Sequence, residues 1–203
     1  MTRGGWPIVA AVLLGCGFTT ALAGDASAPA RVELAHGATT LPALTAGRAV
    51  TAGETLPEGT RLLVPEDGYL RLRLADGSVV NVLARSDVQL RRLRRHRTTG
   101  RSETIIDVRR GKVESEVVPQ KKGRVFEIRA PGAVASVRGT RFDMAVDPDG
   151  RVRAAVTEGE ILLRPRRPAR DGGAAPATAV KAGQGVELDS RGRPVRRHAL
   201  PSR

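Results

Sequence analysis

Hydrophobic and polar residues alternate most clearly between positions 70 and 83. Three leucines at every second position are separated by two arginines, in the order Leu70, Arg71, Leu72, Arg73 and Leu74. Successive side chains of a β-strand point to opposite faces, so this period of two buries the leucines and leaves the arginines in water. Asp76-Gly77 then precedes a second apolar run at 79–82. Asp-Gly between two such runs is typical of a tight turn, so the segment predicts a β-hairpin.

Short alternating runs recur along most of the chain. They lie at 106–108, 113–117, 126–128, 134–137, 142–146 and 152–156. The turn sequence Asp-Pro-Asp-Gly at 147–150 separates the last two runs. A helical period of 3.6 residues is not evident, and 86–97 comes nearest to one. The pattern therefore predicts an all-β domain.

Two of these runs meet at Gly139-Thr140 with no polar loop between them. We expect Gly139 to let the chain pass between two strands where a Cβ atom would clash, and Thr140 to bond to nearby backbone. Phe142 is expected to be the largest side chain of the core. These residues are therefore interpreted first as parts of the scaffold.

Composition and spacing divide the chain into five segments. Residues 24–43 have little periodicity and predict a mobile lead-in, while 44–164 form the β domain. Within that domain Gly47, Gly53 and Gly59 recur every six residues, a spacing found in β-solenoids and also in ordinary meanders. Residues 165–179, rich in Arg, Pro and Gly, predict a loop or linker, and 180–203 predict a last strand and a basic tail.

The first 23 residues have the features of a secretory signal peptide. Arg3 precedes the apolar segment 8–14, and Ala21-Leu22-Ala23 forms a small-residue cleavage signal. The apolar segment is too short to span a bilayer, so we expect an exported, periplasmic protein with no transmembrane span in the mature chain. An alternative is a lipoprotein anchored through Cys16, because 13–16 resembles a bacterial lipobox.

The chain is strongly basic, with a net charge of +13 that comes largely from clustered arginines. The densest cluster supplies candidate anion-binding residues, namely Arg91, Arg92, Arg94, Arg95 and Arg97. The export signal and the shortage of aromatic side chains for base stacking argue against nucleic acid. Anionic envelope polymers are the expected partners, and a merely solvated basic surface is the alternative.

Nothing in the sequence assembles a catalytic site. The three histidines, His36, His96 and His198, lie far in sequence from Ser78 and Thr140, the hydroxyl residues of the predicted turns. General acid–base and nucleophilic catalysis both require such groups to be held together. We therefore expect a protein that is not an enzyme and that uses no cofactor and no metal.

Four segments, taken in order, resemble the FecR domain: 68–80, 108–114, 126–131 and 134–142. The resemblance covers roughly residues 44–164, and Glu158-Gly159 fits the same pattern. The motif residues are Asp76, Gly77, Ser78, Gly111, Arg138, Gly139, Thr140, Phe142 and Gly159. The Asp-Gly-Ser and Arg-Gly-Thr-x-Phe elements weigh most, and the resemblance depends on several ordered motifs because any one alone would be weak.

The resemblance implies a non-enzymatic all-β domain whose many short strands form a solenoid-like or sandwich-like twisted sheet. Founding members of the family receive a signal from an outer-membrane transporter and pass it through a transmembrane helix to a cytoplasmic region that controls a sigma factor. This chain shows neither that helix nor that region, so direct control of a sigma factor is not expected. It is more similar to exported FecR proteins that often carry a wall-binding LysM module, although no LysM module is visible here.

The expected function is that of an exported envelope interaction module, which binds a protein partner, an anionic cell-wall or outer-membrane polymer, or both. The motif residues would serve mainly as scaffold, and an open sheet edge would accept a partner's strand. The alternative is a periplasmic signal-relay component of a FecR-type transmembrane system that regulates a sigma factor.

Overall fold

The computed structural model describes residues 25–41, 47–96, 98–166 and 176–200. Within these ranges the chain forms eighteen strands joined by turns and contains no helix. A helix of the length and hydropathy needed to cross a membrane is accordingly not found among the described residues. The all-β prediction is confirmed.

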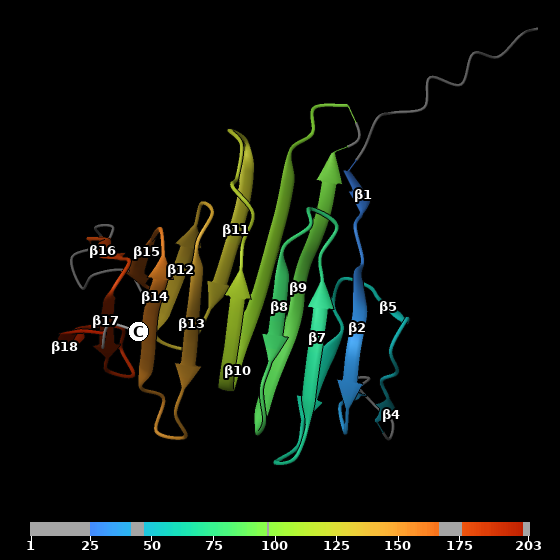
Figure 1. Cartoon of the computed structure of the whole chain (residues 1–203), viewed down its shortest axis with the longest axis horizontal. Coiled ribbons are helices and arrows are strands. Elements are labelled where there is room, and N and C mark those ends of the chain that lie inside the picture. The colour runs from blue at the N-terminus through green and yellow to red at the C-terminus, as the bar shows by residue number, and fades with distance from the viewer. Residues whose placement is uncertain (1–24, 42–46, 97, 167–175, 201–203) are drawn as a thin grey trace, which may run out of the picture.

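The strands form two sheets that lie one in front of the other in the view of Figure 1, and both sheets extend along the long axis of the molecule. In order of pairing, sheet A contains β4 (Arg48–Ala49), β3 (Thr39–Leu41), β6 (Arg61–Val64), β9 (Ser86–His96), β10 (Ser102–Glu116), β11 (Arg124–Arg129), β12 (Ala133–Val137), β15 (Glu160–Pro165) and β16 (Thr178–Lys181), with β1 (Asp25–Ser27) on β9. Sheet B contains β5 (Thr55–Leu56), β2 (Ala30–His36), β7 (Tyr69–Arg73), β8 (Val79–Val82), the second part of β10, β13 (Arg141–Val146), β14 (Val152–Glu158), β17 (Gln184–Leu188) and β18 (Pro194–Ala199).

Strand β10 belongs to both sheets. Residues 102–110 pair with β9 in sheet A, whereas residues 111–116 pair with β13 in sheet B. After β10, antiparallel pairs alternate between the sheets: β11–β12 in A, β13–β14 in B, β15–β16 in A and β17–β18 in B. The chain thus winds from one sheet to the other as it advances, which gives a solenoid-like sandwich.

The hairpin predicted from the leucine–arginine alternation is present as β7 and β8. Leu70 lies opposite Val82 and Leu72 lies opposite Val80. All four of these side chains are fully buried, while Arg73 is exposed. The period of two therefore identified both the strands and the face that each one buries.

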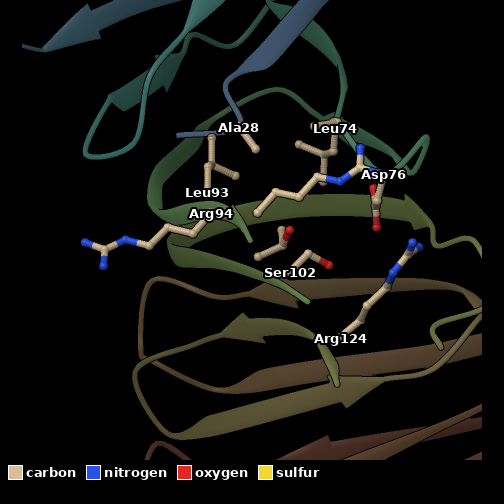
Figure 2. A pocket seen from close by; sticks show the side chains of 10 residues that line it. Ala28, Leu74, Asp76, Leu93, Arg94, Ser102 and Arg124 are labelled. Atoms are coloured by element: carbon tan, nitrogen blue, oxygen red, sulfur yellow. The ribbon is translucent and has the colours of Figure 1, made fainter. Parts of the chain in front are cut away.

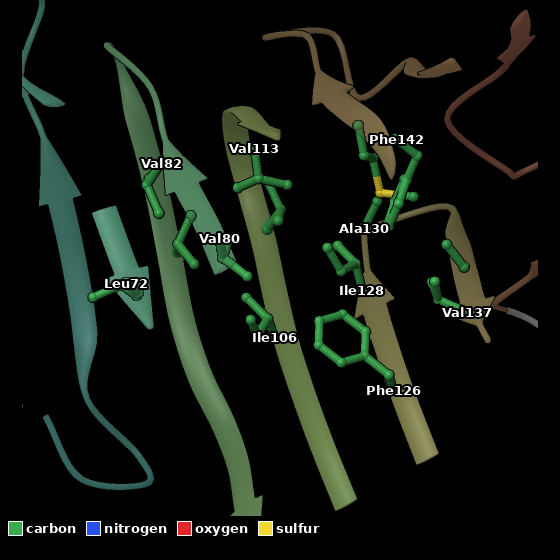
Figure 3. Close-up of a cluster of buried hydrophobic side chains, with 14 of the residues drawn as sticks. Leu72, Val80, Val82, Ile106, Val113, Phe126, Ile128, Ala130, Val137 and Phe142 are labelled. Atoms are coloured by element: carbon green, nitrogen blue, oxygen red, sulfur yellow. The ribbon is translucent and has the colours of Figure 1, made fainter. Parts of the chain in front are cut away.

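The core lies between the two sheets and is mainly aliphatic. Figure 3 shows Leu72, Val80 and Val113 from sheet B in one buried cluster with Ile106 and Ile128 from sheet A. Buried side chains of both sheets form one continuous cluster. Stacking removes the inner faces of both sheets from water, so the hydrophobic effect holds the two sheets together.

The prediction of a mobile lead-in over 24–43 is wrong for the described residues 25–41. Ala30 and Val32 of β2 are completely buried, and β2 pairs with β7 in sheet B. A bulge in this pairing follows Val32, and Leu34 beyond it is 55% exposed. An extra residue reverses the side-chain alternation of a strand, so β2 does not show one apolar face in its sequence. The domain therefore begins before residue 44.

The C-terminal prediction also needs correction, because 180–203 contain more than one last strand and a tail. Lys181 ends β16 in sheet A, and β17 begins three residues later in sheet B. The residues assigned to the tail form β18, whose side chains are all exposed. Only backbone pairing with β17 reveals this strand, since it has no buried face and hence no alternating pattern. Most of the predicted linker, residues 167–175, lies outside the described residues.

Candidate functional site

The Asp-Gly-Ser motif forms the turn between β7 and β8 and binds a distant segment. The Ser78 N–H donates to Asp76 Oδ1 at 2.9 Å, and the Ser78 hydroxyl donates to Asp76 Oδ2 at 3.0 Å. Ser78 Oγ also accepts the Val118 N–H at 3.2 Å, and Gln120 Nε2 donates to Asp76 Oδ2 at 2.9 Å. The turn is thereby fastened to the chain that leaves β10.

The Gly139-Thr140 motif lies at the crossing from β12 in sheet A to β13 in sheet B. Gly139 has a φ of +98°, and a Cβ atom there would lie 2.8 Å from Pro119 Cα. Thr140 Oγ1 donates to the Glu160 carbonyl at 2.9 Å, and a Cβ atom on Gly159 would lie 2.7 Å from the Gly139 carbonyl oxygen. Gly139 thus lies where the chain crosses closely between the two sheets and where a Cβ atom would clash.

These contacts unite motif elements that are far apart in sequence. We call the assembly the motif cluster; it comprises 76–78, 117–120, 139–140 and 159–160. Val117 and Thr140 complete it by exchanging backbone hydrogen bonds of 3.0 and 3.2 Å. Ser78 and Thr140 are buried, and their hydroxyls are used in hydrogen bonds. The hydrogen bonds of the motif cluster therefore hold these distant segments together at one end of the sandwich.

Three motif residues lie outside this cluster. Gly111 is the point at which β10 passes from sheet A to sheet B, next to Ser86. Phe142 is 2% exposed and belongs to the core, while Arg138 is exposed beside Gly139. The structure thus brings together the Asp-Gly-Ser motif, Gly139, Thr140 and Gly159, but not all nine motif residues.

Replacing Ser78 with alanine tests whether the hydrogen bonds of the motif cluster stabilise the fold. We expect Ser78→Ala to lower the free energy of unfolding by about 1–3 kcal/mol, because the half-buried Val118 N–H would lose the hydroxyl of the buried Ser78 as its acceptor. Urea unfolding measures this change. As a control, Ser190→Ala at an exposed turn should stay within about 0.5 kcal/mol of the unchanged protein. Equal effects of the two substitutions on stability would contradict a stabilising role of the motif cluster.

The arginine cluster predicted from the sequence is not one basic patch. Arg92 forms an ion pair with Glu103 at 3.3 Å, and Arg94 forms one with Glu58 at 3.2 Å. The side-chain hydrogen bond from Arg94 holds the pKa of Glu58 below its usual value, so this carboxylate stays charged at neutral pH. The charge of these two arginines is therefore partly neutralised, by a carboxylate of the neighbouring strand β10 and by one of the turn before β6.

The other members of the cluster have different surroundings. Arg91 is exposed at a bulge, since the pairing with β10 moves from Leu90 directly to Arg92. Arg95 lies beyond the bulge, on the same face of β9 as the buried Leu93. Arg97 lies outside the described residues. The bulge thus directs only part of the cluster toward the interior of the sandwich.

Arg95 lines a cavity of about 250 Å³ at the end of the core, next to the motif cluster. Its walls come from both sheets and from the segment before β2: Ala28, Leu74, Ala75, Asp76, Leu93, Arg94, Arg95, Ser102, Thr104 and Arg124. In Figure 2 the Arg124 side chain extends toward Asp76, whereas Arg94 extends away from the cavity. Arg124, Ser102 and Thr104 were not singled out by sequence reasoning, because only the strand register brings them beside Arg95.

Among the described residues, no group of three or more His, Cys, Asp and Glu side chains is placed to hold a metal ion. His36 and His198 are exposed, and His96 Nδ1 accepts the Thr99 N–H at 3.2 Å. The chemistry that this end of the sandwich offers is hydrogen bonding and the attraction of anions.

Two crystal structures of a candidate anti-sigma factor from Parabacteroides distasonis share the fold. They superpose with TM-scores of 0.53 and 0.54, each at 15% sequence identity. In both cases the match covers 70% of this chain and 60% of the other, so this chain spans less than two thirds of that protein. At this identity the likeness concerns the fold alone.

No curated protein matches the sequence. A protein-family model does match: that of the FecR protein, over residues 60–162, which is just over half of the chain. The matched range runs from the start of β6 to the middle of β15, so it includes the whole motif cluster. On this evidence the chain belongs to the FecR family.

Proposed function

We propose that this protein is an exported, non-enzymatic interaction module of the cell envelope that binds a protein partner, with its basic surface adding attraction to an anionic envelope polymer. The observation that carries the proposal is the edge of sheet B at β18. There a six-residue strand is held by β17 on one side only, as far as the described residues extend. Such an edge presents unpaired backbone groups to an added strand.

The side chains of β18 favour an acidic partner over a second copy of this chain. All six are exposed, and they include Arg196, Arg197 and His198, with Val195 65% exposed. Pairing of two β18 strands would bring arginines close together, and like charges on neighbouring strands destabilise pairing. An extended segment that carries Asp or Glu would instead form opposite-charge pairs. We therefore propose a partner with an acidic β-strand.

Photo-crosslinking in the exporting cell tests this docking. A photoreactive amino acid at Arg197 should give a discrete crosslinked protein, whereas one at Arg153, an exposed arginine on the interior strand β14, should not. The crosslink at position 197 should weaken at least several-fold when Arg196 is replaced by Glu. Equal crosslinking at both positions, or none at 197, would contradict docking at this edge.

The non-enzymatic part of the proposal is supported by the use of the candidate nucleophiles. Ser78 and Thr140 are 0% and 3% exposed, and their hydroxyls are engaged in the motif cluster. A buried, hydrogen-bonded hydroxyl has no free approach for a substrate. Purified protein with no turnover of cell-wall substrates is the expected result, and robust hydrolysis would overturn it.

The export part of the proposal rests on the sequence of residues 1–23, which lie outside the described residues. Cleavage after Ala23 would give a periplasmic protein, and the alternative is a lipoprotein anchored through Cys16. The intact mass of the processed protein distinguishes the two, because only the second begins with a lipidated cysteine.

A second candidate function is a signal-relay component that works with a separate membrane partner. Membership of the FecR family favours it, as does the fold shared with the candidate anti-sigma factor. If it is correct, deleting the gene should change transcription of a sigma-factor regulon. The native chain, but not the Arg196→Glu variant, should then restore that transcription.

A further inference from the structure

Three polar residues lie side by side across the end of sheet A. Arg95 of β9 is directly opposite Ser102 of β10, and Ser102 is directly opposite Arg124 of β11. The next row on the same face is Leu93, Thr104 and Phe126, which are all buried. Because cross-strand neighbours share a face, the row 95–102–124 continues the core-facing side of sheet A to the open end of the sandwich, where Arg95 is exposed and Ser102 and Arg124 are half-buried.

The charge of these side chains is not balanced within the cavity. Among the described residues, neither Arg95 nor Arg124 has a carboxylate within ion-pair distance, in contrast to Arg92 and Arg94. Asp76 on the opposite wall already accepts three hydrogen bonds, from the Ser78 N–H, the Ser78 hydroxyl and Gln120. Because Arg95 and Arg124 face only the carboxylate of Asp76 among the residues that line the cavity, and this carboxylate is already hydrogen-bonded, the cavity has a net positive charge.

We infer that this cavity binds a phosphate group, held between Arg95 and Arg124 with Ser102 as a hydroxyl donor. Guanidinium groups present several N–H donors in a fixed fork that matches the oxygens of phosphate, and serine adds a further donor. A cavity of about 250 Å³ admits a phosphate group and a short part of what carries it, but not a polymer chain. A phosphate on an envelope polymer would therefore enter as a terminal or side group.

The motif cluster forms one wall of the cavity through Asp76. Gln120 and Ser78 fix this carboxylate, so its negative charge limits how deeply an anion can enter and turns the ligand toward the two arginines. The proposed phosphate site thus lies next to the Asp-Gly-Ser motif, but the residues of that motif do not bind the phosphate. This inference is independent of docking at β18 and rests on the proposed envelope function only for the source of the phosphate.

Isothermal titration of the full processed protein with inorganic phosphate tests the site directly. The double variant Arg95→Gln/Arg124→Gln should weaken binding at least tenfold. The control Arg31→Gln/Arg110→Gln removes the same charge from exposed positions that are not among the residues lining the cavity, and it should bind as the unchanged protein does. Absence of phosphate binding by the unchanged protein, or equal losses in both double variants, would overturn the inference.

Two further measurements keep the test decisive. If the double variant does not fold, Arg124→Lys retains the charge but loses the fork, and it should still weaken phosphate binding several-fold. Co-sedimentation with lipopolysaccharide, before and after enzymatic removal of its phosphates, shows whether the bound phosphate belongs to a polymer or is the free ion. If co-sedimentation requires both those phosphates and Arg95, the ligand is a phosphate group of the polymer. If the protein binds inorganic phosphate but does not co-sediment, the ligand is the free ion. Neither result depends on crosslinking at β18, so failure of one proposal leaves the other testable.

Discussion

Replacing Gly111 with alanine should destabilise the protein by about 2–5 kcal/mol, a large part of the stability of a typical domain. Gly111 has a φ of +91°, which a residue with a side chain adopts only at a cost. A Cβ atom would also lie 2.2 Å from Ser86 Oγ and 2.5 Å from Ser86 Cα. Ser86 cannot easily retreat, because its hydroxyl accepts the Lys112 N–H at 3.0 Å. Thermal and urea unfolding measure the loss.

The matched control is Gly59→Ala, which separates the two causes. Gly59 has a similar φ of +89°, but a Cβ atom there would meet nothing within 4 Å. It should cost only about 1–2 kcal/mol, from the backbone conformation alone. If the two substitutions proved equal, steric exclusion at the crossing of β10 would not be what the motif glycine provides.

The motif glycines lie where the chain crosses from one sheet to the other. Chains that alternate between stacked sheets must turn sharply at the ends of the sandwich, and Gly111, Gly139 and Gly159 lie at three such turns. At each of them a Cβ atom would approach another part of the chain more closely than 3 Å. The short strands between the turns then need only aliphatic residues on their inner faces. The motif residues therefore specify the winding, and the surface between them is free to carry a binding function.

The sequence predicts this architecture well wherever a strand buries one face. The leucines of β7 and the run that contains Phe142 show a period of two, and each lies where that period places it. Prediction failed at β2, where a bulge reverses the alternation, and at β18, where no side chain is buried. In both strands the backbone pairing, rather than a hydrophobic pattern, determines the structure.

The candidate site was less predictable, because it depends on register between distant segments. Counting in twos from the buried Leu90 would direct Arg92 and Arg94 inward, but the bulge at Arg91 reverses this and directs Arg95 inward instead. Arg124 joins Arg95 only because β11 pairs with β10 at Ser102. Neither the bulge nor this pairing has a local signal in the sequence. The sequence therefore identified the arginine cluster, but not which of its members face the cavity.

The second large effect is expected at Phe142. Phe142→Ala should lower the free energy of unfolding by about 3–5 kcal/mol, because the aromatic ring is 2% exposed and its removal leaves a cavity in a closely packed core. Phe142 and Phe126 are the largest fully buried side chains among the described residues, and Figure 3 shows both in the cluster between the sheets. Few other aromatic residues exist in this chain to fill such a space.

The consequences of Phe142→Ala should extend to the motif cluster. Phe142 follows Thr140 by two residues at the start of β13, opposite Ser115 of β10. A loss of packing there should loosen the paired backbone of Val117 and Thr140, so hydrogen exchange of these two amides should speed up more than that of Val186 in β17. Leu162→Ala, at a side chain that is 43% exposed, should change stability by less than about 1 kcal/mol. Similar losses from both substitutions would place the main support of this fold outside the aromatic core.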